Sequence, residues 1–494
     1  MGNRPGSRTY LYVLAELSCL LLVAGLVLLY VHHRGGSAGR NATTAVVKGS
    51  GLPVPAEDAA RLTVLLEEVP LQKVDESVRY SFLGGYSAST DSGSYSDVNY
   101  PVFRSAAPRY GQAQFDDGDG PPRRLHFALD HSEGAPGAYN LLHLDEEGDC
   151  DLRNNAPRHL LQDPNGLPQA YADIDTIWFE PVRVSFPFAL GDRHPIELLP
   201  RLWLYQDRSP RLGFVAAKVR RGEFAIDGKT YKAFLGYGYA VTGRLDSAFS
   251  TLCLRREDGE YAGLLGTAMD RLGGRRSLGG QWCQFSCSPT GDQLFVYPYQ
   301  GPLGVLQLGA DGRHVKRLEM FGELSTAQGR LTLGHTLENG LLQGADRYEI
   351  PVGDYSSAFL VVRLGDTMFS LSPDSYDQEG RRIERERGAR KIRIREKKPF
   401  VLDFSDKLRV VFVGPSKGSR LALGAQVRVE AVLVDRSLDV ALAGVSDMTQ
   451  SEIKTVTMAD GRKRMMESGP PLQPKVIVKR ANGQIVAEGV MPFG

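Results

Sequence analysis

Cysteine is scarce in this sequence: only five of the 494 residues are cysteines, and Cys19 lies inside an apolar run. The other four do not make the disulfide framework of a small secreted domain, and a chain of this length can bury its own core. No CxxC motif occurs. Cys283, Phe285 and Cys287 alternate, which on a strand places the two sulfurs about 13 Å apart at roughly 3.3 Å per residue. We therefore expect these three side chains to bury one apolar face of a strand.

A strong net charge is also missing. Lys and Arg total 59 and Asp and Glu total 58, so the formal net charge is +1. This balance produces no global field that would attract nucleic acid, and we expect no nucleic-acid partner. The nine histidines show no HExxH or other paired-ligand spacing. No catalytic motif is found, so the sequence assigns no catalytic residue.

Long apolar runs are missing except for one, residues 10–31, which can cross a bilayer core of about 30 Å once at roughly 1.5 Å per residue. We predict a single-pass transmembrane helix, a signal anchor, with residues 1–9 as a short cytoplasmic tail. The long remainder is then extracytoplasmic, the location is the cell membrane, and the lipid bilayer is the partner of residues 10–31. A cleaved signal peptide, cut after Ala38, is the alternative.

Helical patterns are rare beyond the apolar run. Residues 34–55 are rich in Gly, Ser, Ala and Thr, which is typical of a flexible tether. Residues 55–68 carry the one pattern of a soluble helix, with apolar side chains at helical spacing. We therefore interpret residues 32–70 as a tether with a short helix. The stretch 87–122, rich in Gly, Ser and Asp, is interpreted as a long loop.

Short alternating strands and tight turns dominate the rest of the chain. Dipeptides that favour two-residue hairpin turns recur at Asp227-Gly228, Asp258-Gly259, Asp311-Gly312, Asp460-Gly461 and Asn482-Gly483. The predicted fold class is all-β, an N-terminal single transmembrane helix followed by two or three β-sandwich-like domains. Their predicted ranges are 71–174, 175–398 and 399–494, and the last has the size of an immunoglobulin-like sandwich.

The last predicted hairpin lies in that C-terminal domain. Val476 and Val478 alternate before Asn482-Gly483, and the apolar pattern resumes after it. We expect a two-residue turn, with Val476 and Val478 on the core face.

The sharpest candidate site is an acidic loop, residues 145–151, which follows an apolar run. Its carboxylates Asp145, Glu147, Asp149 and Asp151 alternate, and a tight turn between antiparallel strands could aim them at one Ca²⁺ ion. Cys150 occupies the position where such a turn favours Gly, and Ala156 the position where a bidentate Glu usually closes the shell. An acidic, solvated turn without metal is therefore the alternative.

Two other motifs are weaker. The segment Gly243-Arg244-Leu245-Asp246, followed by a strand ending at Arg255, resembles a degenerate copy of the acidic loop and its strands. Arg255 stands where the first carboxylate would, so no metal is expected there. Residues 288–296 resemble the turn of a β-propeller blade, but no repeat follows at propeller spacing, and we predict a single hairpin.

These motifs carry a family resemblance. Residues 144–152, Gly243-Arg244-Leu245-Asp246 and the terminal segment 474–494 are similar to parts of certain exported bacterial β-rich proteins. That uncharacterised family has Asp-rich loops and a C-terminal immunoglobulin-like domain. The resemblance implies export and this architecture, and it implies no activity.

Two functions follow as hypotheses. The first is a non-enzymatic, membrane-tethered extracytoplasmic protein with a binding or scaffolding role in the cell envelope, whose partner is an envelope protein or polysaccharide. The alternative is an envelope hydrolase that acts on glycans through a carboxylate pair, which must lie about 5–9.5 Å apart across a cleft. Glu180 and Asp175, near Trp178, are generic candidates for that pair.

Overall fold

The structure is a computed structural model that describes residues 62–83, 86–115, 123–131, 139–167, 170–171, 174–187, 193–205, 210–238, 241–247, 250–257, 272–309, 317–326, 329–336, 342–377, 379–383, 391–403, 408–414, 420, 430–435, 438, 440–457, 463–479 and 482–490. The chain divides into two compact units, residues 1–48 and 49–494, and all described residues belong to the second. The predicted tail, the anchor at residues 10–31 and most of the tether lie outside the described residues. No helix within these ranges is long and apolar enough to cross a bilayer.

Strands form nearly all the regular structure of the described residues, which confirms the all-β prediction. The helical elements are single turns: η1 (Leu71–Lys73), α2 (Glu76–Arg79), η2 (Tyr80–Phe82) and η3 (Met448–Gln450).

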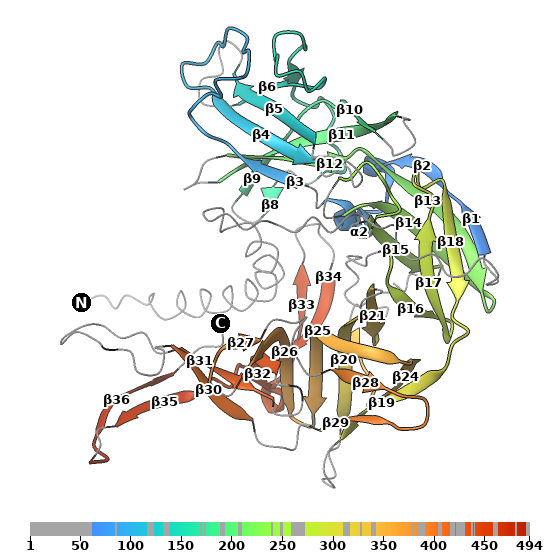
Figure 1. Cartoon of the computed structure of the whole chain (residues 1–494), viewed down its shortest axis with the longest axis vertical. Coiled ribbons are helices and arrows are strands. Elements are labelled where there is room, and N and C mark those ends of the chain that lie inside the picture. Colours follow the sequence, from blue (N-terminus) through green and yellow to red (C-terminus); the bar gives the residue numbers. More distant parts are fainter. Residues whose placement is uncertain are drawn as a thin grey trace, which may run out of the picture. The chain divides into compact units, whose positions relative to one another are not determined.

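A four-stranded antiparallel sheet contains the acidic loop (Figure 1). Its strands, in order, are β4 (Arg109–Phe115), β5 (Arg123–Asp130), β6 (Leu141–Leu144) and β7 (Arg158–His159). Phe127 of β5 is buried in the main core, whereas His126 and Asp130 lie on the opposite face, as alternation along a strand requires. Gly111 is needed beside Phe127, because a Cβ at this position would lie 2.1 Å from the ring.

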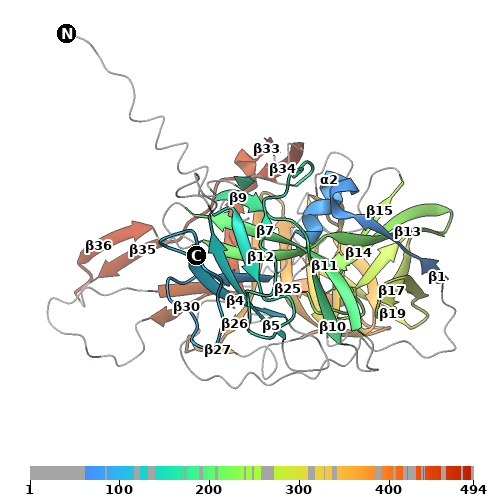
Figure 2. The same cartoon turned by 90° about the horizontal axis from the view of Figure 1, so that it is seen from above.

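Two further antiparallel sheets follow along the chain (Figures 1 and 2). One has the order β3 (Tyr86–Ser89), β12 (Arg211–Ala216), β11 (Arg193–Leu204), β9 (Ile174–Trp178) and β8 (Ala170–Tyr171), with β10 (Val182–Pro187) also paired to β11. The other has the order β15 (Ser250–Arg256), β14 (Lys229–Tyr237), β13 (Lys218–Ile226) and β2 (Glu67–Pro70). Asp227 and Gly228 join β13 to β14 with φ of 49° and 72°, which confirms this predicted two-residue hairpin.

The largest sheet of the described residues has 13 strands. Its main path runs β1 (Leu62–Leu65), β18 (Gln293–Pro298), β17 (Gln281–Cys287), β16 (Arg275–Leu278), β21 (Gly329–Leu333), β20 (Leu318–Thr326), β25 (Gly353–Leu364), β26 (Thr367–Tyr376), β32 (Val440–Asp447), β31 (Glu430–Val434) and β30 (Arg409–Gly414). Two short strands join it from the side: β27 (Arg382–Ile383) pairs with β26, and β28 (Ile392–Ile394) pairs with β25. The hairpin of β17 and β18 is the one predicted around residues 288–296.

The remaining strands form small sheets. One has the order β24 (Arg347–Pro351), β19 (Leu303–Gly309) and β29 (Phe400–Asp403). The others are pairs: β22 (His335–Thr336) with β23 (Leu342–Gln343), β33 (Glu452–Thr457) with β34 (Lys463–Ser468), and β35 (Lys475–Lys479) with β36 (Ile485–Val490).

Two large hydrophobic clusters organise these sheets. The first collects buried residues from Val64 to Val296, and the second collects Trp282 together with residues from Leu306 to Val445. Cys283, Phe285 and Cys287 all belong to the first cluster, so the predicted apolar face of this strand is confirmed.

The predicted boundaries at residues 71, 175 and 399 do not separate these sheets. β1 and β2, assigned to the tether, pair with β18 and β13, and the hairpin of β8 and β9 spans residue 175. Across residue 399, β29 pairs in parallel with β19, and β32 pairs with β26. Residues 399–494 therefore do not form a sandwich of their own, because alternation marks strands without naming their partners.

Residues 62–68 are strand and not the predicted helix. Val64 and Leu66 are buried while Leu65 between them is 75% exposed, so the pattern here has period two. Pairing of Val64 with Leu294 of β18 decides the conformation, since tertiary context overrides local propensity. The loop predicted at residues 87–122 was also wrong in part, because it contains most of β3 and all of β4.

The predicted two-residue turn at Asn482-Gly483 is wrong. Lys479 pairs with Ile485, so five residues separate the paired positions. Gly483 has φ of 85°, and the Asn482 side chain accepts a hydrogen bond from the Gln484 amide at 3.1 Å. β35 and β36 form a sheet of their own, and Val476 is only partly buried.

Candidate functional site

The acidic loop, residues 145–151, begins where β6 ends. Its first carboxylate, Asp145, is fully buried and accepts backbone hydrogen bonds from Gly148 at 2.7 Å, Asp149 at 3.0 Å and Cys150 at 3.0 Å. Gly148 and Cys150 have φ of 76° and 62°, which turns the chain back around that carboxylate. Asp145 therefore holds the loop closed by binding backbone amides.

The other acidic side chains of the loop also bind protein groups. Asp149 accepts from the Asp151 amide at 3.0 Å and from the Asn154 side chain at 2.7 Å. Asp151 pairs with Arg153, whose side-chain hydrogen bonds lower the pKa of Asp151 to about 2. Glu147 is exposed.

The structure thus places the four predicted calcium ligands on one loop but does not make their oxygens converge. In the described part of the chain no group of three or more His, Cys, Asp or Glu side chains is arranged to hold a metal ion. The carboxylate spacing is the same for a ligand shell and for a loop closed by its own amides. Calcium binding stays a sequence-based prediction that this geometry does not favour.

Sequence reasoning missed a buried polar face on the same sheet. Its members lie on β4, β5 and β6, on the side away from the main core: the half-buried Tyr110 and Gln112, and the buried His126, Asp130 and His143. We name residues 91–107 the covering loop, because Tyr95 of this loop contacts the His126 ring at 5.2 Å between centroids and Phe103 contacts the His143 ring at 5.7 Å.

Asp130 fastens the covering loop to the sheet. Its carboxylate accepts hydrogen bonds from the backbone amides of Arg104 at 2.9 Å and Ser105 at 2.7 Å. Burial would raise the pKa of Asp130, but these amides, with a smaller contribution from His143, outweigh it and lower the pKa. A second attachment joins the covering loop to the acidic loop, where the Asn99 amide donates to the Cys150 carbonyl at 2.8 Å and the Leu152 amide donates to the Asn99 carbonyl at 2.9 Å.

Two histidines lie beneath the covering loop. His126 and His143 are both buried, and the Nδ1 atom of each has no hydrogen-bond partner among the described residues. Nε2 of His126 lies 3.2 Å from the Gln112 side chain. Burial lowers the pKa of His143, which keeps this ring neutral over Phe103. The spacing of His126 and Asp130 on one strand could have indicated this face, because residues four apart on a strand point the same way.

The tryptophan beside the residues proposed for glycan hydrolysis is buried. Trp178 is buried, and the Arg201 guanidinium lies 5.3 Å from its ring and 4.1 Å from the ring of Trp203. Glu180 accepts a hydrogen bond from the His159 amide at 3.1 Å, whereas Asp175 is exposed at the start of β9. The Trp178 ring is therefore not available for stacking on a sugar.

The Arg201 side chain is held inside the protein by a backbone hydrogen bond. It is buried and donates to the Leu83 carbonyl at 2.7 Å, and burial lowers its pKa to about 9.

The degenerate copy of the acidic loop is held by ion pairs. Arg244 pairs with Asp246 at 2.7 Å, and the Leu245 amide donates to the Pro289 carbonyl at 2.9 Å. Arg255, at the position of the missing carboxylate, pairs with Asp75 at 2.6 Å.

A different kind of candidate site lies in the C-terminal part of the chain. Large apolar side chains stand exposed on β30, where Val410 is 53% and Phe412 is 62% exposed. The hairpin β35–β36, named here the C-terminal hairpin, exposes Ile477 by 43%, Ile485 by 53% and Val490 by 59%. Several apolar side chains exposed on one strand or one hairpin are typical of a docking surface, whereas single exposed ones are ordinary.

Comparison with known proteins identifies no relative: no protein-family model, no curated protein and no solved structure matches the chain.

Proposed function

We propose that the protein is a membrane-tethered, extracytoplasmic binding or scaffolding protein of the cell envelope. Residues 10–31 anchor it, and the exposed apolar side chains of β30 and the C-terminal hairpin bind its protein partner. The observation that supports this proposal is the exposure of Val410 and Phe412 at alternate positions on one face of β30.

The buried polar groups of the β4–β7 sheet support a binding role over a catalytic one. The buried carboxylates Asp130 and Asp145 spend their acceptor capacity on backbone amides, and the buried imidazoles lie under the covering loop. A general acid or base must reach its substrate within hydrogen-bond distance, and these groups are turned away from solvent.

Photo-crosslinking in intact cells tests the binding surface. Phe412→p-benzoylphenylalanine in the full chain should give a discrete protein adduct on irradiation in the cells that make the protein. The matched control carries the same probe at Glu223, an exposed polar position on β13. Adduct at position 412 no stronger than at position 223 would refute the docking surface.

Cell fractionation tests the anchor separately. The full chain should sediment with membranes, whereas residues 51–494 should be recovered in the soluble fraction with the same far-ultraviolet circular dichroism as the full chain in detergent. A 51–494 chain that only aggregates would mean that residues 10–31 are part of the folded core.

A further inference from the structure

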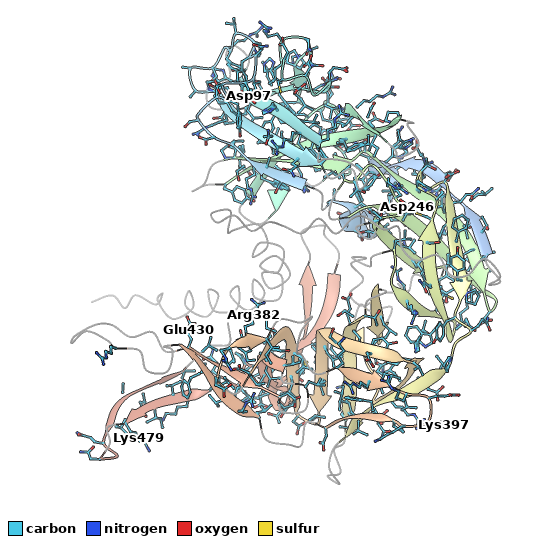
Figure 3. The ribbon with its side chains drawn as sticks, in the orientation of Figure 1. Asp97, Asp246, Arg382, Lys397, Glu430 and Lys479 are labelled. Carbon is cyan, nitrogen blue, oxygen red and sulfur yellow. The ribbon has the colours of Figure 1, made fainter. Side chains whose placement is uncertain are left out.

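The chain contains three Asn-Gly pairs, and the structure describes two of them. Asn482-Gly483 lies in the turn between β35 and β36, at the end of the C-terminal hairpin where Lys479 is found (Figure 3). Asn165-Gly166 lies in a turn before β8, and Asn339-Gly340 lies outside the described residues. Such a pair can modify itself, because the glycine nitrogen can attack the side-chain carbonyl carbon and no Cβ shields it. The two described pairs have different surroundings.

The Asn482 side chain is folded over the peptide bond that follows it. Its Oδ1 accepts a hydrogen bond from the Gln484 amide at 3.1 Å, so the side-chain carbonyl reaches past Gly483 to the next residue. This hydrogen bond closes a ring of atoms that contains both Cγ of Asn482 and the Gly483 nitrogen. Groups held near their reaction geometry react faster than free ones, because the entropy of approach is already lost.

The attacking nitrogen is accessible. Asn482 and Gly483 are both exposed, and the Gly483 amide donates no hydrogen bond within the described residues. A Cβ at Gly483 would meet nothing within 4 Å, so the turn has open space for a new ring and for water. Neither packing nor hydrogen bonding of this nitrogen therefore opposes the reaction.

Asn165-Gly166 is held in a different way. The Leu167 amide, two residues after Asn165, donates to the Pro164 carbonyl at 2.9 Å, and the Asn165 side chain makes no hydrogen bond in the described part of the chain. The Gly166 carbonyl accepts from Arg79, and a Cβ at Gly166 would lie 3.1 Å from Nη1 of Arg79. This turn is fixed against the protein without a side chain folded over the Asn-Gly peptide bond.

We propose that Asn482 is a modification site, at which the folded chain converts its own amide into aspartate and isoaspartate with water as the only co-reactant. The Gly483 nitrogen attacks Cγ of Asn482, the Cγ–Nδ2 bond breaks, and a succinimide ring forms. The proton of the attacking nitrogen passes through solvent to the departing nitrogen, which leaves as ammonia. Water then adds to one of the two ring carbonyls and breaks its bond to the ring nitrogen. Opening on one side gives aspartate, and opening on the other gives isoaspartate.

The products change the turn of the hairpin. Both add a negative charge, and isoaspartate also lengthens the backbone between positions 482 and 483 by a methylene group. Turn length sets the register of a hairpin, so the pairing of Lys479 with Ile485 should shift. The inference goes beyond the proposed binding function, since the reaction requires no partner.

The test follows the purified full chain in detergent, incubated at pH 7 and at pH 9 in water enriched in a heavy oxygen isotope and then digested for mass spectrometry. In the native chain, Asn482 should incorporate heavy oxygen at least about tenfold faster than Asn165, with isoaspartate among the products. In concentrated urea the two positions should react at similar rates, because both turns are lost. The rate at Asn482 should rise with pH, since the attacking nitrogen must lose its proton.

Two variants separate the folded-over side chain from the Asn-Gly sequence itself. Gln484→Pro removes the amide that holds the Asn482 side chain, because proline has no N–H, and should slow the native reaction to the rate in urea. Gln484→Ala keeps that amide at the same exposed position and should keep the parent rate. Far-ultraviolet circular dichroism of each variant checks that the chain is still folded.

Three outcomes would overturn the proposal. The first is an equal rate at Asn482 and Asn165 in the native chain. The second is aspartate at position 482 without isoaspartate, because direct hydrolysis of the amide gives aspartate alone. The third is a folded Gln484→Pro variant that reacts as fast as the parent chain, since the hydrogen bond of the turn would then have no part in the reaction.

Discussion

The sheet β4–β7 and the strands β30–β31 share an alternating sequence pattern, but the second face of the first is covered and that of the second is exposed. Both alternate in period two, so each has two distinct faces. On β4–β7 the second face carries His126, Asp130 and His143, and the chain covers it with its own loop. On β30 the second face carries Val410 and Phe412, which stay exposed.

The difference teaches that the chain covers the polar face of the β4–β7 sheet and leaves the apolar face of β30 exposed. A buried carboxylate or imidazole without partners costs several kcal/mol, so Asp130 and Asp145 each need nearby backbone amides supplied by a loop. An exposed apolar strand carries no such penalty in the monomer, and its cost is the risk of association. The covered polar face of β4–β7 is therefore expected to contribute to stability, and the exposed apolar face of β30 to binding.

Loss of Asp145 should give the largest effect on stability. Asp145→Ala removes the acceptor of three backbone hydrogen bonds and leaves the amides of Gly148, Asp149 and Cys150 inside a closed loop. We expect the free energy of unfolding to fall by about 3 kcal/mol, measured by urea denaturation of the full chain in detergent. The control is Glu147→Ala on the same loop, which is exposed and should change nothing. Equal effects from the two variants would mean that the loop is not closed by Asp145.

A smaller effect is expected where an ion pair fixes a hairpin in the C-terminal part. Glu467 of β34 pairs with Arg363 at 2.8 Å and accepts from Ser451 at 3.0 Å. Glu467→Ala should cost about 2 kcal/mol, because it leaves the buried Arg363 with less compensation. Hydrogen exchange should rise first in β33 and β34.

The exposed pair of Lys475 and Glu488 on the C-terminal hairpin, 3.1 Å apart, provides the matched control. Glu488→Ala should leave stability unchanged, since exposed ion pairs contribute little. If Glu488→Ala destabilised the protein as much as Glu467→Ala, the hairpin would be packed against the sheet.

Acid should weaken the covered polar face by a still smaller amount. Burial lowers the pKa of His143 below its ordinary value of 6.5, so below that pH the unfolded chain takes up a proton that the folded chain does not. Stability should therefore fall as the pH drops below 6.5, with a slope of at most about 1.4 kcal/mol per pH unit from this group. Asp130, whose pKa is lowered, adds a loss only in more acidic solution, below its ordinary value of 3.8.

The variant His143→Phe isolates that contribution. It keeps a ring against Phe103 and removes the titrating group, so the slope between pH 7 and pH 5 should flatten. His159→Phe alters an exposed histidine and should keep the parent slope. A slope that His143→Phe does not alter would assign the acid sensitivity to other groups.

Local features of this fold could be read from the sequence, and long-range ones could not. The hairpin at Asp227-Gly228 follows from the backbone that these two residues adopt, and the buried face of Cys283 and Cys287 follows from alternation. Residues 62–68 fit a helical spacing as well as a strand, and only pairing with β18 decides between them. The pairing of β29 with β19 joins segments about 100 residues apart, which no local pattern records.

The candidate sites show the same limit. The sequence located the acidic loop correctly, but the spacing of Asp145, Glu147, Asp149 and Asp151 does not say what their oxygens accept. The polar face was missed because its residues come from three strands and are joined only by pairing, as when His143 lies opposite Ala128.

Calcium should have the smallest effect on stability. Its addition tests whether the acidic loop is closed by its own hydrogen bonds or by a bound ion. Asp145 and Asp149 already accept hydrogen bonds from amides and Asn154, and Arg153 neutralises Asp151, so the loop has no need of a cation to relieve repulsion. We expect millimolar Ca²⁺ to shift the melting temperature by less than about 1 °C, since binding to the native state stabilises only when the concentration exceeds Kd. A larger rise that Asp149→Ala removes, accompanied by heat in calorimetry, would show instead that the four carboxylates rearrange around the ion. In that case the sequence spacing, and not the hydrogen bonds of the closed loop, would be the correct guide to this part of the molecule.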